Sequence, residues 1–183
     1  MKTDRLANHS RLLATATLVL IVAMLLVNAA CWFFPSQMSG YGLDFNLTSM
    51  TGRLKADTLQ MPLWQIFGGI VLSSIPLLIL AKGLLALRRL FQSYSRGEYF
   101  APESAELLGS VGKYVSLWVL FSCLLEPIMS VWITFLRPAG DRLLSFGFSS
   151  SQLVALFLAA SVMIVARGLH DACVLARENQ QFV

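Results

Sequence analysis

One carboxylic acid, Glu126, lies inside an otherwise apolar stretch, "FSCLLEPIMSVW". It is 13 positions from Lys113 and 11 from Arg137, or roughly 16 to 20 Å from either along a helix. If the stretch crosses a bilayer, an ionised carboxylate at that depth costs about 2.5 to 3.5 kcal/mol. We therefore expect Glu126 to face other helices and to be protonated or hydrogen-bonded. The acid could bind a proton or cation, or it could hold helices together.

Asn28 is the polar residue that we expect to meet this acid. It lies four residues before Trp32, and Glu126 lies six residues before Trp132, which gives the two side chains a similar depth. Pro127 also leaves a backbone carbonyl one turn back without its helical partner, which favours polar company. Because interhelical polar pairs are a common use of such groups, we favour a hydrogen-bonded clasp over a transport site.

The segments that position these residues are long and apolar. The chain has 183 residues, of which 56% are apolar and 13% charged, a composition too apolar for an ordinary soluble domain. About 20 helical residues cross a bilayer core of about 30 Å, and four runs reach that length. We predict an all-α fold, a single-domain integral membrane four-helix bundle of two transmembrane hairpins with cytoplasmic helical extensions. The expected spans are 12–34, 63–83, 113–136 and 148–167, the outer loops 35–61 and 137–147, the cytoplasmic loop 84–112 and the tail 168–183.

The cations predict the orientation of these spans. Ten of them fall on the side of the termini and the central loop, and four fall on the other side. By the positive-inside rule, both termini lie in the cytoplasm of a cell whose inner membrane holds the chain. The net charge of +4 then needs no nucleic-acid partner to explain it. The ten are Lys2, Arg5, Arg11, Lys82, Arg88, Arg89, Arg96, Lys113, Arg167 and Arg177, and the four are Arg53, Lys55, Arg137 and Arg142.

Apolar residues recur at intervals of three and four after Lys82, so we expect the second helix to continue into the cytoplasm and stop near Gly97. A further helix is expected to start at Pro102 and run into the third span, because proline fits the first helical turn and Glu103 favours the positive end of the helix dipole. The last span is expected to continue past Arg167. The recurring apolar residues are Leu84, Leu87, Leu90, Phe91 and Tyr94.

The loop "LFQSYSRGEYFAPESAELLGSVG" and the tail "LARENQQFV" give the chain a family resemblance. Together with four spans, they resemble the YoaS-like family of uncharacterised bacterial four-helix membrane proteins, although Ser104 stands where the family has asparagine. The resemblance implies no established activity. It implies membrane sequestration or control of a transcription factor, since such proteins are often encoded beside a helix-turn-helix regulator. The matching residues are Arg88, Arg89, Gly97, Phe100, Glu103, Glu178 and Asn179.

We therefore expect a regulatory interaction module that sequesters, or relays a signal to, a cytoplasmic protein such as that regulator. A partner helix would lie on an apolar stripe with arginines at its rim. A small oligomeric transporter or channel subunit that uses Glu126 is the alternative, and a homo-oligomer is left open. No catalytic motif is found, so we expect no enzyme, metal or cofactor. The expected partner-binding residues are Leu87, Arg88, Arg89, Leu90, Phe91, Tyr94, Gly97, Phe100 and Glu103.

Overall fold

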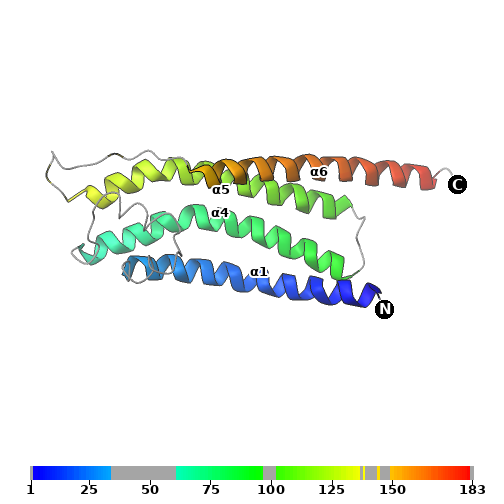
Figure 1. Ribbon diagram of the computed structural model, residues 1–183, viewed down its shortest axis with the longest axis horizontal. Coiled ribbons are helices and arrows are strands. Elements are labelled where there is room, and N and C mark those ends of the chain that lie inside the picture. Colours follow the sequence, from blue (N-terminus) through cyan, green and yellow to red (C-terminus); the bar gives the residue numbers. More distant parts are fainter. Residues whose placement is uncertain are drawn as a thin grey trace. The chain divides into compact units, whose positions relative to one another are not determined.

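The fold is all-α over the part of the chain that the structure describes. The computed structural model has four helices and, within these residues, no strand (Figure 1). The helices are α1 (Lys2–Phe33), α4 (Leu63–Ser95), α5 (Pro102–Thr134) and α6 (Ser150–Gln181). The described residues are 2–33, 61–96, 102–136, 138, 144 and 149–181.

Each of the four helices is long and apolar enough to cross a membrane, which confirms this part of the prediction. The helices are also longer than the expected spans. α1 begins at Lys2, ten residues before the predicted start of its span at residue 12, so the basic N-terminal segment is helical as well. α4 runs on to Ser95, and α5 starts at Pro102 and continues without a break into its apolar part, as the sequence predicted.

The start of α6 is fixed by a reciprocal cap. The backbone N–H of Gln152 donates to the Ser149 hydroxyl at 3.3 Å, and the backbone N–H of Ser149 donates to Gln152 Oε1 at 2.9 Å. The first N–H groups of a helix lack their usual carbonyl partners. The pair gives the Ser149 N–H an acceptor and gives the Gln152 N–H a second one, beside the Ser149 backbone oxygen at 3.0 Å.

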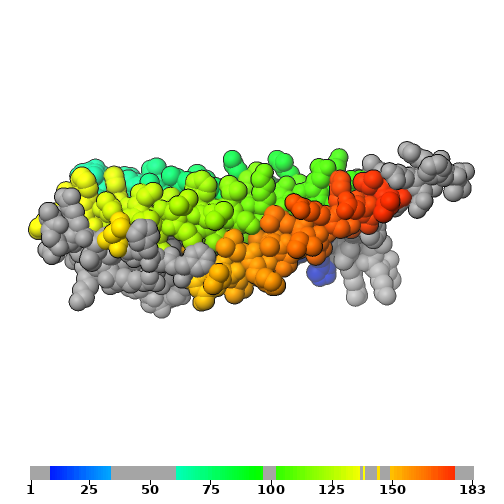
Figure 2. All heavy atoms as spheres, turned by 90° about the horizontal axis from the view of Figure 1, so that it is seen from above, coloured from blue at the N-terminus to red at the C-terminus, as the bar shows by residue number. Residues whose placement is uncertain are grey.

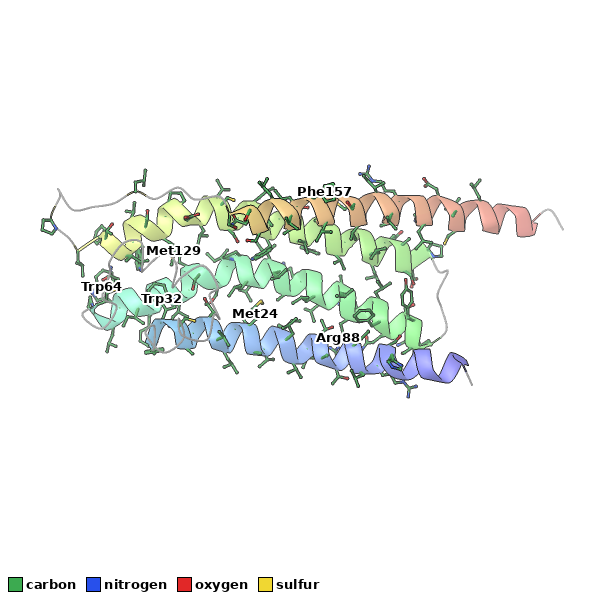
Figure 3. The ribbon with its side chains drawn as sticks, in the orientation of Figure 1. Met24, Trp32, Trp64, Arg88, Met129 and Phe157 are labelled. Atoms are coloured by element: carbon green, nitrogen blue, oxygen red, sulfur yellow. The ribbon has the colours of Figure 1, made fainter. Side chains whose placement is uncertain are left out.

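The chain forms two compact units, each of which takes a part of several helices. The unit of residues 22–78 and 120–148, called the polar unit below, contains parts of α1, α4 and α5. Its aromatic side chains meet edge to face: the ring centroids of Phe33 and Phe67 lie 6.4 Å apart, and those of Trp64 and Trp132 lie 5.9 Å apart. Figure 3 shows Trp32 and Trp64 in this unit. Its buried apolar cluster consists of Cys31, Trp32, Ile66, Leu125, Met129 and Ile133.

The other unit consists of residues 1–21, 79–119 and 149–183 and is called the charged unit below. Within it, α4 packs against α5, since a Cβ on Gly83 would lie 3.0 Å from the Cβ of Tyr114. α5 in turn packs against α6, because a Cβ on Gly112 would lie 2.6 Å from Met163 Cγ. Figure 2 shows α6, orange to red, lying along the green part of α5.

Large apolar side chains cover the outer surfaces of the helices. Phe157 on α6 is 72% exposed, and Leu12, Val71 and Leu124 on the other three helices are each more than three-fifths exposed. So many exposed large apolar side chains are unfavourable in water. It is the surface expected of helices whose outer faces contact lipid.

Candidate functional site

Among the described residues of the polar unit, five polar side chains are buried. None is more than 8% exposed, and they come from α1, α4 and α5. Buried polar groups need hydrogen-bond partners, because an unpaired one costs free energy wherever water cannot reach it. These five residues, Asn28, Gln65, Glu126, Ser130 and Thr134, are the candidate site.

Asn28 joins α1 to α4. Its side-chain Nδ2 donates to the hydroxyl oxygen of Ser73 at 3.0 Å and to that of Ser74 at 3.2 Å. One turn further along α1, the indole Nε1 of Trp32 donates to the same Ser73 oxygen, also at 3.2 Å. Both serine hydroxyls donate in turn to the backbone oxygen of Ile70, at 3.1 and 2.7 Å. The two serine hydroxyls therefore accept from side chains of α1 and donate to a backbone oxygen of α4, which links the two helices.

Gln65 joins the beginning of α4 to the end of α5. Its side-chain Nε2 donates to the backbone oxygen of Trp132 at 2.7 Å, while the indole Nε1 of Trp132 donates to the backbone oxygen of Gln65 at 3.0 Å. The other side-chain atom of this amide, Oε1, is buried without a hydrogen-bond partner. Because the pair is reciprocal, a shift of α4 along α5 would weaken both hydrogen bonds.

The rings of Trp32 and Trp132 pack against two adjacent glycines of α4. A Cβ on Gly69 would overlap the ring of Trp32, and a Cβ on Gly68 would overlap the ring of Trp132. The indoles of α1 and α5 thus lie directly on the backbone of α4, a close approach that small residues permit between membrane helices. This contact places both indole N–H groups within reach of their acceptors on α4.

Glu126 is 8% exposed and lies in the same unit as Asn28. One turn after Glu126 in α5, the Ser130 hydroxyl donates to the Pro127 backbone oxygen at 2.9 Å. The Thr134 hydroxyl donates to the Ser130 backbone oxygen at 2.7 Å. Of the buried polar residues that the structure describes in this unit, Glu126 is the one that carries a carboxyl group. Its burial agrees with the prediction that it would face protein, and its pairing with Asn28 stays a prediction.

No family model, curated protein or solved structure matches this chain. The chemistry of the site is therefore inferred from its own geometry. Amide, hydroxyl and indole groups from three helices bind one another, which holds the helices at a fixed rotation and depth. The arrangement can do this without any ligand.

The residues expected to bind a partner belong to the charged unit. Those that the structure describes differ in their exposure. Leu90 is 3% exposed, and Leu87, Phe91 and Tyr94 are half-buried, so the apolar stripe packs largely within the chain. Arg88, labelled in Figure 3, is half-buried with its Nε buried and unpartnered.

Of the other expected partner-binding residues, Arg89 and Glu103 are exposed. Gly97 and Phe100 lie outside the described residues. Ser73 and Ser74, which accept hydrogen bonds from Asn28, and Gln65 are not among the site residues predicted from the sequence. The available signal for Gln65 was an uncharged polar residue inside the apolar run that begins at Leu63.

Proposed function

We propose that this chain is a multi-pass protein of the bacterial inner membrane, with both termini in the cytoplasm, that works as a non-enzymatic interaction module for a soluble partner. The four apolar helices and their exposed apolar surfaces support the membrane location. The excess of cations on the side of the termini supports the orientation.

Helix length is the observation that carries this proposal. The helices have 32 or 33 residues, whereas about 20 are enough to cross the bilayer core. The excess of about 12 residues is roughly 18 Å of helix. Apart from Glu126, the charged residues of the described helices lie in the charged unit, on the side of the chain termini and the α4–α5 connection. The helices thus extend beyond the lipid as charged rods on that side.

The surface offered to a partner is the exposed charged rim of these extensions. Arg89 and Arg96 at the end of α4 and Glu103 at the start of α5 are exposed, whereas Leu90 between them is buried. We therefore place the docking surface on the charged residues rather than on the apolar stripe. Arginines form paired hydrogen bonds with carboxylates, so the partner that fits is a protein with an acidic surface.

The resemblance to the YoaS-like family suggests the kind of partner. A helix-turn-helix regulator held at the membrane could not reach its DNA sites, so docking would sequester it. Release on a membrane signal would relay that signal.

The proposal is tested by charge reversal at the rim. Arg89→Glu is expected to weaken capture of the partner in a cross-linked pull-down from native membranes, while insertion and abundance stay at the wild-type level. Ala172→Glu is the control, because it places the same acidic side chain at an exposed position on α6 of the charged unit. Equal capture by Arg89→Glu and Ala172→Glu would contradict the proposed docking surface.

A small oligomeric transporter is the second candidate, and the burial of Glu126 favours it. A protonatable acid shielded from lipid is a common element of ion pathways. Flux of protons or cations in liposomes separates the two candidates. The interaction module predicts no flux that differs between wild type and Glu126→Gln, whereas flux that is lost in Glu126→Gln favours transport.

A further inference from the structure

A groove of about 550 Å³ lies between α5 and α6 in the charged unit. That volume is in the range of small-molecule sites in proteins. The polar unit and the proposed docking rim make no use of the groove. Its polar lining is Glu106 and Lys113 from α5 with Arg167, His170 and Asp171 from α6.

Small residues form the base of the groove. A Cβ on Gly109 would lie 3.6 Å from the Cβ of Ala166, so the helix backbones are close but not in collision there. One turn further along α5 the helices touch, because a Cβ on Gly112 would lie 2.6 Å from Met163 Cγ and 2.8 Å from the Ala159 backbone oxygen. The groove is therefore narrowed towards the apolar parts of the two helices and widens towards their charged ends.

The two contacts also give the register of the helices. Gly109 faces Ala166 and Gly112 faces Met163, which means that α5 and α6 run antiparallel. At 1.5 Å per residue, Lys113 is nearest the apolar parts and Arg167 follows about 7 Å further out. Glu106 and then Asp171 lie beyond Arg167, the latter by about 6 Å. The cations thus lie on the membrane side of the groove and the acids on its outer side.

This order falls at the border of the membrane. Lys113 directly precedes the apolar run of α5, and Arg167 directly follows that of α6. On the membrane side of the groove, Ile164 and Val165 of α6 are 71% and 62% exposed. A lipid could therefore bind with its polar headgroup in the groove and its acyl chains along α6.

His170 supplies independent evidence that the groove binds a polar group. It lines the groove, and its Nδ1 is buried without a hydrogen-bond partner. Buried polar atoms are nearly always paired, and one without a partner calls for an explanation. A ligand with hydrogen-bonding oxygens would supply the missing partner.

We propose that this groove binds the headgroup of a phospholipid that carries both a phosphate and a primary ammonium, as phosphatidylethanolamine does. Lys113 and Arg167 contact the phosphate, since both side chains are phosphate binders. Glu106 and Asp171 accept hydrogen bonds from the ammonium further out. An anionic headgroup without an amine would meet two unpaired acids, and a quaternary ammonium cannot donate to them. The inference rests on the membrane insertion proposed above.

The test is native mass spectrometry of the full-length protein released from vesicles of equal phosphatidylethanolamine, phosphatidylglycerol and phosphatidylcholine with identical acyl chains. The retained lipid is expected to be phosphatidylethanolamine, in at least about threefold excess over either competitor. Glu106→Gln with Asp171→Asn should abolish this preference and raise retention of phosphatidylglycerol. Lys113→Gln with Arg167→Gln should lower retention of all phospholipids.

Ala172→Lys is the matched control, because it adds positive charge beside the groove without changing its lining, and it should keep the wild-type preference. Equal retention of the three lipids by the wild type would overturn the proposal. So would a preference unchanged in the acid-neutralised variant, or soluble phosphoethanolamine binding as tightly as the lipid.

Carbonate extraction of membranes and partner capture are measured on the same variants. A chain that washes out of membranes refutes the proposed function itself. A chain that stays in membranes and captures its partner without a lipid preference refutes the groove alone.

Discussion

Gln65 and Trp132 exchange hydrogen bonds across two helices, each side chain donating to the other residue's backbone oxygen, at 2.7 and 3.0 Å. α5 ends at Thr134, and the last carbonyls of a helix lack partners within it. The amide of Gln65 supplies one of those partners. The same bond therefore pairs a carbonyl of the last turn of α5 and attaches that turn to the beginning of α4.

Trp132→Phe is expected to destabilise the protein by about 0.5 to 1.5 kcal/mol, because it keeps an aromatic ring but removes the indole donor to Gln65. Thermal unfolding in detergent micelles measures this. Trp64→Phe is the control, since the Trp64 side chain is half exposed and should tolerate the change better. Equal losses in both variants would show that the indole hydrogen bond contributes nothing.

Gly69→Ala is expected to lower the free energy of unfolding by about 1 to 3 kcal/mol, because the added methyl group overlaps the ring of Trp32. Gly168→Ala is its matched control. A Cβ at Gly168 would have no neighbour within 4 Å, and alanine favours a helix over glycine by up to about 1 kcal/mol. The two Gly→Ala changes should therefore shift the unfolding temperature in opposite directions, and a shift in the same direction would count against the tryptophan–glycine contact.

Asn28 and Ser74 are expected to be energetically coupled. A double-mutant cycle with Asn28→Leu and Ser74→Ala should give about 0.6 kcal/mol, and at most about 1.7 kcal/mol, the range measured for hydrogen bonds between membrane helices. Reversible unfolding in mixed micelles provides the four stabilities. Strictly additive losses would mean that the 3.2 Å contact contributes no stability.

Leu90 and Arg89 are neighbours in the sequence, but their replacement by alanine is expected to change stability by very different amounts. Leu90→Ala should cost about 2 to 5 kcal/mol of stability, because the side chain is 3% exposed. Arg89→Ala should change stability by at most about 0.5 kcal/mol, because its side chain is exposed. Thermal unfolding of the two variants measures these changes. A Leu90→Ala protein as stable as the wild type would show that Leu90 is not needed for packing, and would favour the apolar stripe as part of the docking surface.

The helices could be predicted from the sequence because their signals are local. The apolar runs, Pro102 at the start of α5 and Ser149 before α6 each act within a few residues of themselves. The longer α1 was not predicted, because the segment from Lys2 to Arg11 lacks an apolar run and its helix continues from the apolar part that follows.

The contacts of the site could not be predicted in the same way. A helix that is apolar all round gives no hydrophobic pattern from which to read its rotation, so the side of α4 that faces α1 stayed undetermined. The selection of Ser73 and Ser74 by Asn28 depends on that rotation. For Leu90 the pattern correctly indicated an apolar face, but periodicity cannot say whether such a face meets another protein or the chain's own helices.

The side of the membrane on which the charged ends lie is tested most directly by cysteine labelling. In a variant whose native cysteines are replaced, single cysteines at Ala172 and Ser151 mark the two ends of α6, both exposed. A membrane-impermeant maleimide applied to intact spheroplasts should label the cysteine at 151, and should label the one at 172 only after permeabilisation. Labelling at 172 in intact spheroplasts would contradict the account.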